Sequence, residues 1–122
     1  MIEHVDNLTG SRFWINCTAH IDWSQVPLLS NVENLADDGI ITGASDRNWQ
    51  SYGSDVGLPA SFTPAQLALL TDPQTSGGLL IAVAPEAIDE LVSLLKENNI
   101  PESCLTPIGR VISKVGEWEV VF

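Results

Sequence analysis

The sequence predicts an α+β fold, in which helices pack in layers against a mixed β-sheet. Segments with strand and helix patterns interleave along the 122 residues, and their connections include both short turns and longer crossovers. Hydrophobic residues make up 44% of the chain, which suffices for a modest core. This length favours a single domain over residues 1–122.

The first predicted strand covers residues 13–22, where aromatic and β-branched residues dominate. Residues 1–16 are interpreted as the tail of a preceding helix, over residues 1–9, and a linker, because Thr9-Gly10-Ser11 breaks any regular element. Alternation along the strand separates its side chains into two sets, with Cys17, Ala19 and Ile21 on one face and Thr18, His20 and Asp22 on the other.

Two helices are predicted in the middle of the chain. Residues 30–39 form the first, with Ser30 or Asn31 as its N-cap and Gly39 as the left-handed residue after its end. Residues 62–72 form the second, in which Thr63 is the cap, Pro64 the first helical residue and Gln66 the third residue after the cap.

The segment between these helices, residues 40–61, lacks a clear period and is rich in glycine and polar residues. An irregular segment this long within a small domain is either disordered or functional. Trp49 and Tyr52 are aromatic anchors, and they favour an ordered loop.

The C-terminal part is predicted to contain a buried strand, a helix and two further strands. Residues 79–84 are continuously apolar, which is typical of a strand buried on both faces. Residues 85–99 form the clearest helix, because apolar residues recur there at helical spacing. Strands at residues 104–113 and 117–122 are joined through residues 114–116.

The charge balance limits the classes of partner. With 5 Lys and Arg against 16 Asp and Glu, the net charge is −11, so the chain should repel nucleic acid and anionic membranes. No apolar run approaches the roughly 20 residues of a membrane-spanning helix, and no signal-peptide pattern opens the sequence. We therefore expect a cytoplasmic protein in which Cys17 and Cys104 are free, buried and inert thiols rather than a disulfide.

Residues 72–78, Asp-Pro-Gln-Thr-Ser-Gly-Gly, form the first candidate functional loop. Pro73 fixes the entry, Gln74, Thr75 and Ser76 offer donors and acceptors, and Gly77-Gly78 allows close approach to the backbone. No lysine follows the glycines, so the loop is not a P-loop. Local chemistry leaves two interpretations open: a ligand-facing loop, or a helix-to-strand connector whose polar groups satisfy one another.

Residues 43–49 form the second candidate. Ser45 and Asn48 could hydrogen-bond a ligand and Arg47 could pair with an anion, although a capped turn is an equally good interpretation. His20 and Asp22 share a strand face but supply two metal ligands at most, so we predict no metal site. The chain has no nucleophile elbow and no complete set of groups for phosphoryl transfer, which argues against a complete enzyme.

Four motifs give the chain a resemblance to the C-terminal domain of the selenide, water dikinase (selenophosphate synthetase) family. Residues 72–80 match the signature of that domain, and residues 43–48 stand where the family has Gly-Gly-Thr-x-x-Asn, with Ala44 and Ser45 replacing Gly and Thr. Residues 108–111 match its Ile-Gly-x-Val element, and residues 20–29 resemble its strand before a proline turn.

The resemblance implies a fold like the C-terminal domain of aminoimidazole ribonucleotide synthetase. It implies a parent enzyme, usually a homodimer, that makes selenophosphate from selenide, ATP and water with magnesium, and releases AMP and phosphate. The family's catalytic Cys or Sec, its Lys and its metal aspartates belong to an N-terminal ATP-binding domain and have no counterpart here. The expected role of this chain is to close the cleft, with cleft-facing candidates Gly43, Ser45, Arg47, Asn48, Asp72, Gln74, Thr75, Ser76, Gly77 and Gly78.

Two alternatives belong to different classes. One is the C-terminal domain of a related ATP-dependent synthetase, which the signature at residues 72–80 disfavours. The other is a free-standing binding or interaction module, which would require no ATP-binding domain in the same polypeptide.

Overall fold

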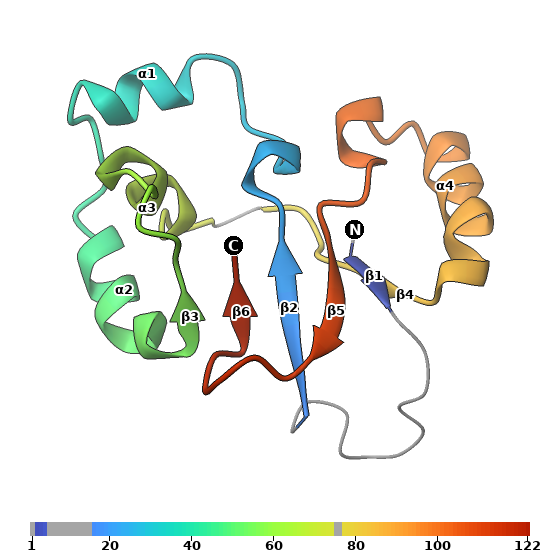
Figure 1. Cartoon of the computed structure of the whole chain (residues 1–122). Helices are drawn as coiled ribbons and strands as arrows, with labels where there is room; N and C mark the ends of the chain where they lie inside the picture. The colour runs from blue at the N-terminus through green and yellow to red at the C-terminus, as the bar shows by residue number, and fades with distance from the viewer. Residues whose placement is uncertain (1, 5–15, 75–76) are drawn as a thin grey trace. The chain divides into compact units, whose positions relative to one another are not determined.

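The computed structural model describes residues 2–4, 16–74 and 77–122 (Figure 1). The chain forms two compact units, one of Met1–Pro27 with Leu79–Phe122 and the other of Leu28–Gly78. We call them the sheet unit and the helical unit and describe each by itself. Compact units also occur within single domains, so the expectation of one domain over residues 1–122 stays a prediction.

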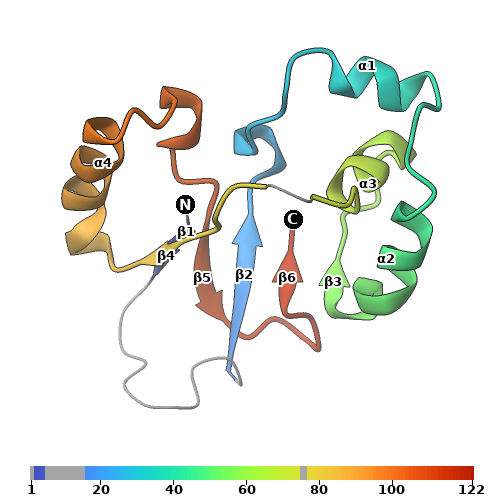
Figure 2. The same cartoon turned by 180° about the vertical axis from the view of Figure 1, so that it is seen from behind.

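The sheet unit is built on a mixed sheet whose strands run in the order β4-β1-β5-β2-β6 (Figures 1 and 2). β1 lies parallel to both β4 and β5, β2 is antiparallel to β5, and β6 is parallel to β2. Together with the helices, this confirms the predicted α+β class. The strand bounds are β1 (Ile2–His4), β2 (Cys17–Ile21), β4 (Ala82–Val83), β5 (Gly109–Ser113) and β6 (Val120–Val121).

The N-terminal prediction was wrong for residues 2–4, which form a strand rather than a helix end. Ile2 pairs with Ala82 on one side and with Gly109 on the other. Both partners are distant in sequence, so pairing within the sheet decides the conformation and local pattern does not. The rest of the expected helix tail and linker, residues 5–15, lies outside the described residues.

One face of β2 carries the core of the sheet unit, as the alternation predicted. Cys17, Ile21 and Val111 are buried, and the partly buried side chains packed against them are Ala19, Val26, Ile108, Val120 and Phe122. The ring of Phe122 also meets Trp23 edge to face, with centroids 6.1 Å apart. Trp23 belongs to the short 3-10 turn η1 (Trp23–Gln25) that follows β2.

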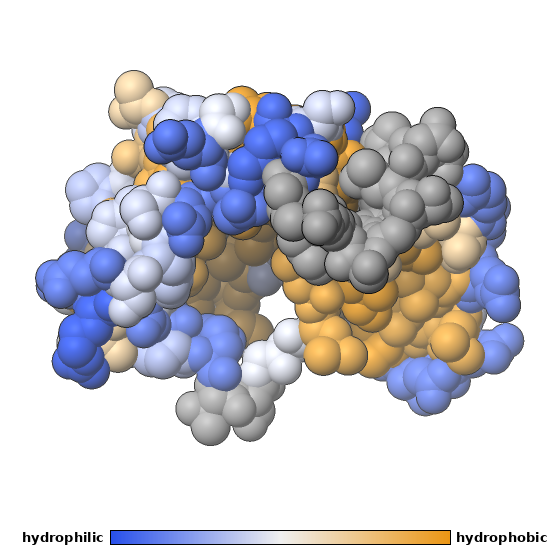
Figure 3. Space-filling view, turned by 90° about the horizontal axis from the view of Figure 1, so that it is seen from below, coloured by the Kyte–Doolittle hydropathy of each residue, from blue (hydrophilic) through white to orange (hydrophobic). Residues whose placement is uncertain are grey.

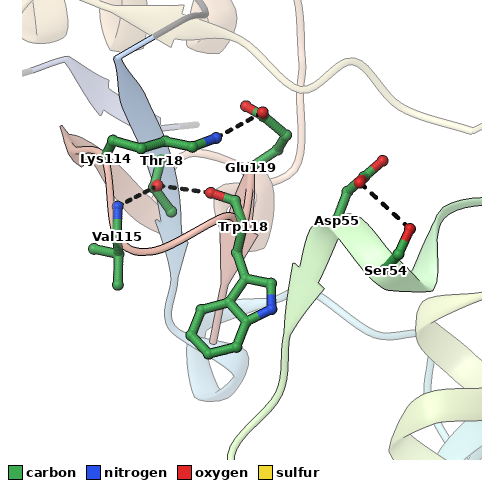
Figure 4. A network of polar contacts seen from close by, with 7 residues as sticks. All are labelled: Thr18, Ser54, Asp55, Lys114, Val115, Trp118 and Glu119. Atoms are coloured by element: carbon green, nitrogen blue, oxygen red, sulfur yellow. Dashed lines mark hydrogen bonds and ion pairs between the residues drawn. The ribbon is translucent and has the colours of Figure 1, made fainter.

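The two C-terminal strands are not neighbours, because β2 lies between β5 and β6. Their connection crosses the end of β2, where Thr18 holds it (Figure 4). The Thr18 hydroxyl accepts a hydrogen bond from the Val115 amide and donates one to the Trp118 carbonyl, both at 2.9 Å. Lys114 Nζ forms an ion pair with Glu119 Oε1 at 2.6 Å across the same connection.

The predicted buried strand at residues 79–84 is reduced to β4, and its burial was predicted wrongly. Leu79 is 87% exposed and Leu80 is 62% exposed, while β4 lies at the edge of the sheet. The apolar run therefore enters the sheet with its first residues uncovered.

The predicted C-terminal helix is present as η3 (Pro85–Ala87) followed by α4 (Ile88–Glu97). Asn98 caps its end through a bond from its side-chain amide to the Leu94 carbonyl, and Asn99 is left-handed with φ 58°. The 3-10 turn η4 (Glu102–Cys104) replaces the start of the strand expected at residue 104. Cys104 is consequently exposed, contrary to the prediction, whereas Cys17 is buried as expected.

The helical unit contains α1 (Val32–Asp37), α2 (Ser45–Tyr52), η2 (Gly53–Asp55), β3 (Val56–Gly57) and α3 (Pro64–Leu70). α1 ends as predicted at Gly39, which has φ 78°. α3 begins with the predicted capping box: Thr63 Oγ1 accepts from the Gln66 amide at 3.1 Å, and Gln66 Oε1 accepts from the Thr63 amide at 2.8 Å.

The expectation of an irregular segment over residues 40–61 was wrong, because residues 45–52 form α2. This helix is supported by bonds that a scan for hydrophobic period does not reveal, among them Arg47 Nη1 to the Gly43 carbonyl and Ser51 Oγ to the Arg47 carbonyl. None of the helices in the described part of the chain has the length and apolar character that crossing a bilayer would require.

Candidate functional site

The two polar motifs predicted from the sequence both lie in the helical unit, and the structure brings them together. Residues 43–48 form the start of α2, and residues 72–78 follow the end of α3. Side chains from the first motif bind backbone carbonyls of α3 directly before the second motif begins. The candidate site is therefore one cluster rather than two separate loops.

Asn48 makes the shorter of these bonds. Its Nδ2 lies 2.8 Å from the carbonyl oxygen of Thr71, the residue that caps the C-terminal end of α3. A carbonyl only accepts hydrogen bonds, so the group of Asn48 that faces it must be the NH₂ donor. This side chain has a partner within the protein and is only partly exposed.

Ser45 is buried, with 4% of its surface exposed. Its hydroxyl lies 3.1 Å from Thr42 Oγ1 and donates to the Ala68 carbonyl at 3.4 Å. The preceding Ala44 has φ −89° and ψ −20°, an ordinary right-handed conformation. Alanine in place of the family's glycine therefore imposes no backbone strain at this point.

Arg47 differs from its neighbours because it is exposed. It donates a hydrogen bond to the Gly43 carbonyl at 3.1 Å, which folds it back over the start of α2. The only ion pair found among the described residues joins Lys114 to Glu119, so the charge of Arg47 is not neutralised by a carboxylate in that part of the chain. Of the predicted residues, this side chain is the best placed to meet an anion.

The second motif starts with a short polar turn. Gln74 Nε2 donates to Asp72 Oδ2 at 3.1 Å, and both side chains precede the glycine pair. A Cβ added to Gly77 would lie 2.9 Å from Gln74 Cβ, whereas one added to Gly78 would meet nothing within 4 Å. Glycine at position 77 thus permits the close packing of this turn, while Thr75 and Ser76 lie outside the described residues.

The predicted strand pair His20 and Asp22 lies in the sheet unit, apart from this cluster in sequence and fold. Asp22 Oδ1 accepts from the Ser24 amide at 3.0 Å and from Ser24 Oγ at 2.7 Å, so it caps η1. Within residues 2–4, 16–74 and 77–122, no three His, Cys, Asp or Glu side chains meet in a way that could hold a metal ion.

Sequence reasoning missed the role of Thr71, the anchor of the cluster. Its side chain is 1% exposed, and its hydroxyl donates to the Leu67 carbonyl at 2.8 Å. The available signal was the spacing of Ser45 and Asn48: residues three apart share one face once the segment is helical. Neither residue indicates by itself which distant carbonyl it will bind.

Comparison with known proteins identifies relatives of one name. No family model matches the chain. A selenide, water dikinase of Paraburkholderia xenovorans is 48% identical over 106 residues, which is 87% of this chain and 29% of that protein. Those of Pseudomonas straminea and Rhizobium meliloti are 46% identical over 94 residues and 53% over 78, covering 77% and 64% of this chain and 26% and 22% of theirs.

The chain spans less than a third of the length of these curated relatives. The matches agree with the motifs at residues 43–48 and 72–80, which the structure joins in one cluster. The chain therefore belongs to the selenide, water dikinase family, to whose C-terminal region it corresponds.

Proposed function

We propose that this chain works as the C-terminal part of an enzyme that makes selenophosphate from selenide, ATP and water, and releases AMP and phosphate. The observation that carries the proposal is the 48% identity over 106 residues with a selenide, water dikinase. An identity this high over most of the chain supports a shared biochemical role as well as a shared fold.

Within that enzyme, the cluster of residues 43–48 and 72–78 faces the active-site cleft. Support comes from the division of labour among its side chains. Ser45 and Asn48 are bound to carbonyls of α3, whereas Arg47, Gln74 and the Gly77-Gly78 backbone are exposed. Exposed amides and a guanidinium on a fixed base are the groups that bind an anionic ligand.

The rest of the parent polypeptide supplies the ATP-binding domain, the magnesium ligands and the reactive Cys or Sec. The described residues hold no group of three potential metal ligands, so their donor set does not fit a magnesium site of their own. Arg47 is the only cationic side chain among residues 28–78, which is too little charge for a triphosphate. ATP and magnesium therefore belong to the partner domain, and the whole enzyme acts as a homodimer.

The exposed start of the apolar run supports a covering partner. Figure 3 shows hydrophobic side chains gathered on one face of the sheet unit. Leu79 and Leu80 are 87% and 62% exposed, although they follow the glycine pair of the family signature directly. Exposed apolar surface of this kind marks an interaction site, and the ATP-binding domain is the proposed occupant.

A chimera tests the proposal. In it, this chain replaces the matched 106 residues of the Paraburkholderia xenovorans protein, and AMP formation is measured with ATP, magnesium and selenide. We expect selenide-dependent AMP formation from the chimera and none from the 122-residue chain alone. AMP from the chain alone, or a folded chimera without activity, would contradict the proposal.

Two substitutions in the chimera test the cleft-facing role. Arg47→Ala and Thr75→Ala are expected to lower kcat/KM by about tenfold or more, because each removes a group that would bind a developing or bound anion. The melting temperature should stay the same. Gln50→Ala is the matched control, because Gln50 is exposed on the same helix outside the motif. Unchanged kinetics for both variants would leave residues 72–78 as a simple connector.

A further inference from the structure

We infer that Ser45 and Asn48 are positioning residues, which fix the C-terminal end of α3 and thereby the start of the loop at residues 72–78. They act through the backbone of α3 and not by contact with a ligand. The functional consequence rests on the proposed function, since it assumes that this loop faces the cleft. The structural part of the inference stands on the hydrogen bonds alone.

The end of α3 needs such support because of how it terminates. The last carbonyls of a helix have no partner within the helix and require one from elsewhere. α1 solves this with the left-handed Gly39, but α3 ends at Thr71 with φ −101° and ψ 3° and has no glycine there. Side chains take over instead, and Thr71 Oγ1 serves the Leu67 carbonyl at 2.8 Å.

The N-terminal turn of α2 serves the next two carbonyls. Ser45 Oγ donates to Ala68 and Asn48 Nδ2 donates to Thr71, so one turn of α2 spans the final turn of α3. The Asn48 bond, at 2.8 Å, is the stronger of the two, because the Ser45 bond is 3.4 Å long. Both donors are held in place, since the Asn48 amide binds the Ala44 carbonyl and Ser45 is buried.

The orientation of the Thr71 peptide is transmitted directly to the loop. Asp72 and Pro73 follow Thr71, and the proline ring fixes its own φ near −65°. Gln74 then bonds back to Asp72, and Gly77 packs against Gln74. Few torsions remain free between the Asn48 bond and the glycine pair, so loss of this bond should change the loop before it changes the remainder of the unit.

The decisive variant is Asn48→Asp in the 122-residue chain. Aspartate has the same shape, but it replaces the donor by a carboxylate oxygen that repels the Thr71 carbonyl. We expect the amide resonances of Gln74, Gly77 and Gly78 to shift in ¹H–¹⁵N spectra, and amide exchange in residues 72–78 to accelerate about five- to tenfold, as loss of one hydrogen bond implies. Asn48→Ala should give the same shifts if the aspartate variant does not fold.

Two matched controls separate positioning from general destabilisation. Asn34→Asp makes the same change of charge on exposed α1, where Asn34 bonds only to the Asn31 side chain. Thr63→Ala removes the capping box at the opposite end of α3 and lowers stability without touching the carbonyls of Ala68 and Thr71. Both controls should leave the resonances of Gln74, Gly77 and Gly78 in place. In addition, Ser45→Thr, which keeps the hydroxyl, should preserve the loop spectrum that Ser45→Ala alters.

The same variants in the chimera distinguish this inference from the proposed function. A positioning role predicts that Asn48→Ala shifts the loop resonances and lowers kcat together. Lost activity with unchanged loop resonances would show that Asn48 binds ligand directly and would overturn the inference. Shifted resonances with a chimera that is inactive before any substitution would retain the inference and remove the proposed function.

Discussion

Gly109 is the residue of β5 at which the backbone of β2 leaves no room for a side chain. A Cβ at this position would lie 2.1 Å from the His20 carbonyl oxygen and 3.0 Å from Ile21 Cα. All of these are backbone atoms of paired strands, so none can move aside as a flexible side chain would. The glycine of the Ile-Gly-x-Val motif thus has a structural explanation: it permits close approach of the two central strands.

Replacing this glycine should be costly. For Gly109→Ala we expect a loss of about 3 kcal/mol in the free energy of unfolding, the upper end for overpacking, because the strands must separate. Urea denaturation followed by circular dichroism measures it. Gly43→Ala is the control: a Cβ there meets nothing within 4 Å, and the change should stay within about 1 kcal/mol. Equal effects at both positions would contradict the steric argument.

At the same scale, the sequence identified residue types better than their partners. Thr63, Pro64 and Gln66 were predicted in their roles because a capping box is local. Asn48 was predicted as polar and important, but its partner Thr71 is 23 residues away and depends on how α2 packs against α3. A role that depends on a distant backbone carbonyl cannot be predicted from one segment.

Among the elements, the connection between β5 and β6 depends on a single buried hydroxyl. Thr18 is 0% exposed and bonds both Val115 and Trp118, residues on the chain that passes the end of β2. Replacing it by valine keeps the shape and removes both bonds. We expect Thr18→Val to cost about 1–3 kcal/mol, because a donor and an acceptor are left without partners.

Thr18→Ser provides the comparison, because it keeps the hydroxyl and loses one methyl group, worth about 0.8 kcal/mol. Chemical denaturation of both variants gives the two free energies. Hydrogen exchange of the Ala19 amide, which bonds to the Glu119 carbonyl, reports whether β6 detaches locally. A valine variant as stable as the serine variant, with unchanged exchange, would show that the connection does not need this hydroxyl.

The same element explains where pattern-based prediction of strands stopped. Two strands joined through residues 114–116 were expected, and both exist as β5 and β6. Their separation by β2 was not predictable, because the hydroxyl of Thr18, about one hundred residues earlier, holds the connection across the end of β2. Likewise α2 has no strong hydrophobic period, and bonds to α3 support it.

For the whole molecule, the apolar run at residues 79–84 is the clearest conflict between pattern and structure. Six consecutive apolar residues are typical of a strand covered on both faces, yet only Ala82 and Val83 form a strand and Leu79 is 87% exposed. The conflict disappears if the pattern belongs to a longer protein. The relatives are more than three times as long as the matched region, so the chain's hydrophobic pattern suits a surface that another domain covers.

This explanation predicts an effect that depends on context. In the 122-residue chain, Leu79→Asp and Leu80→Asp change exposed positions, and each should alter the free energy of unfolding by less than about 0.5 kcal/mol. In the chimera with the Paraburkholderia xenovorans protein, the same leucines would be buried against the ATP-binding domain. Each substitution should then cost about 2 kcal/mol or more, because a buried apolar side chain is replaced by a charge.

Thermal unfolding of the chain and the chimera, each with and without the substitutions, measures this difference. Leu94→Asp is the matched control, because Leu94 is 54% exposed on α4 outside the apolar run and should behave alike in both proteins. A small effect of Leu79→Asp and Leu80→Asp in both contexts would mean that no domain covers this surface. A large effect confined to the chimera would locate the partner on the residues that directly follow the family signature, and would explain why an exposed segment keeps the composition of a core strand.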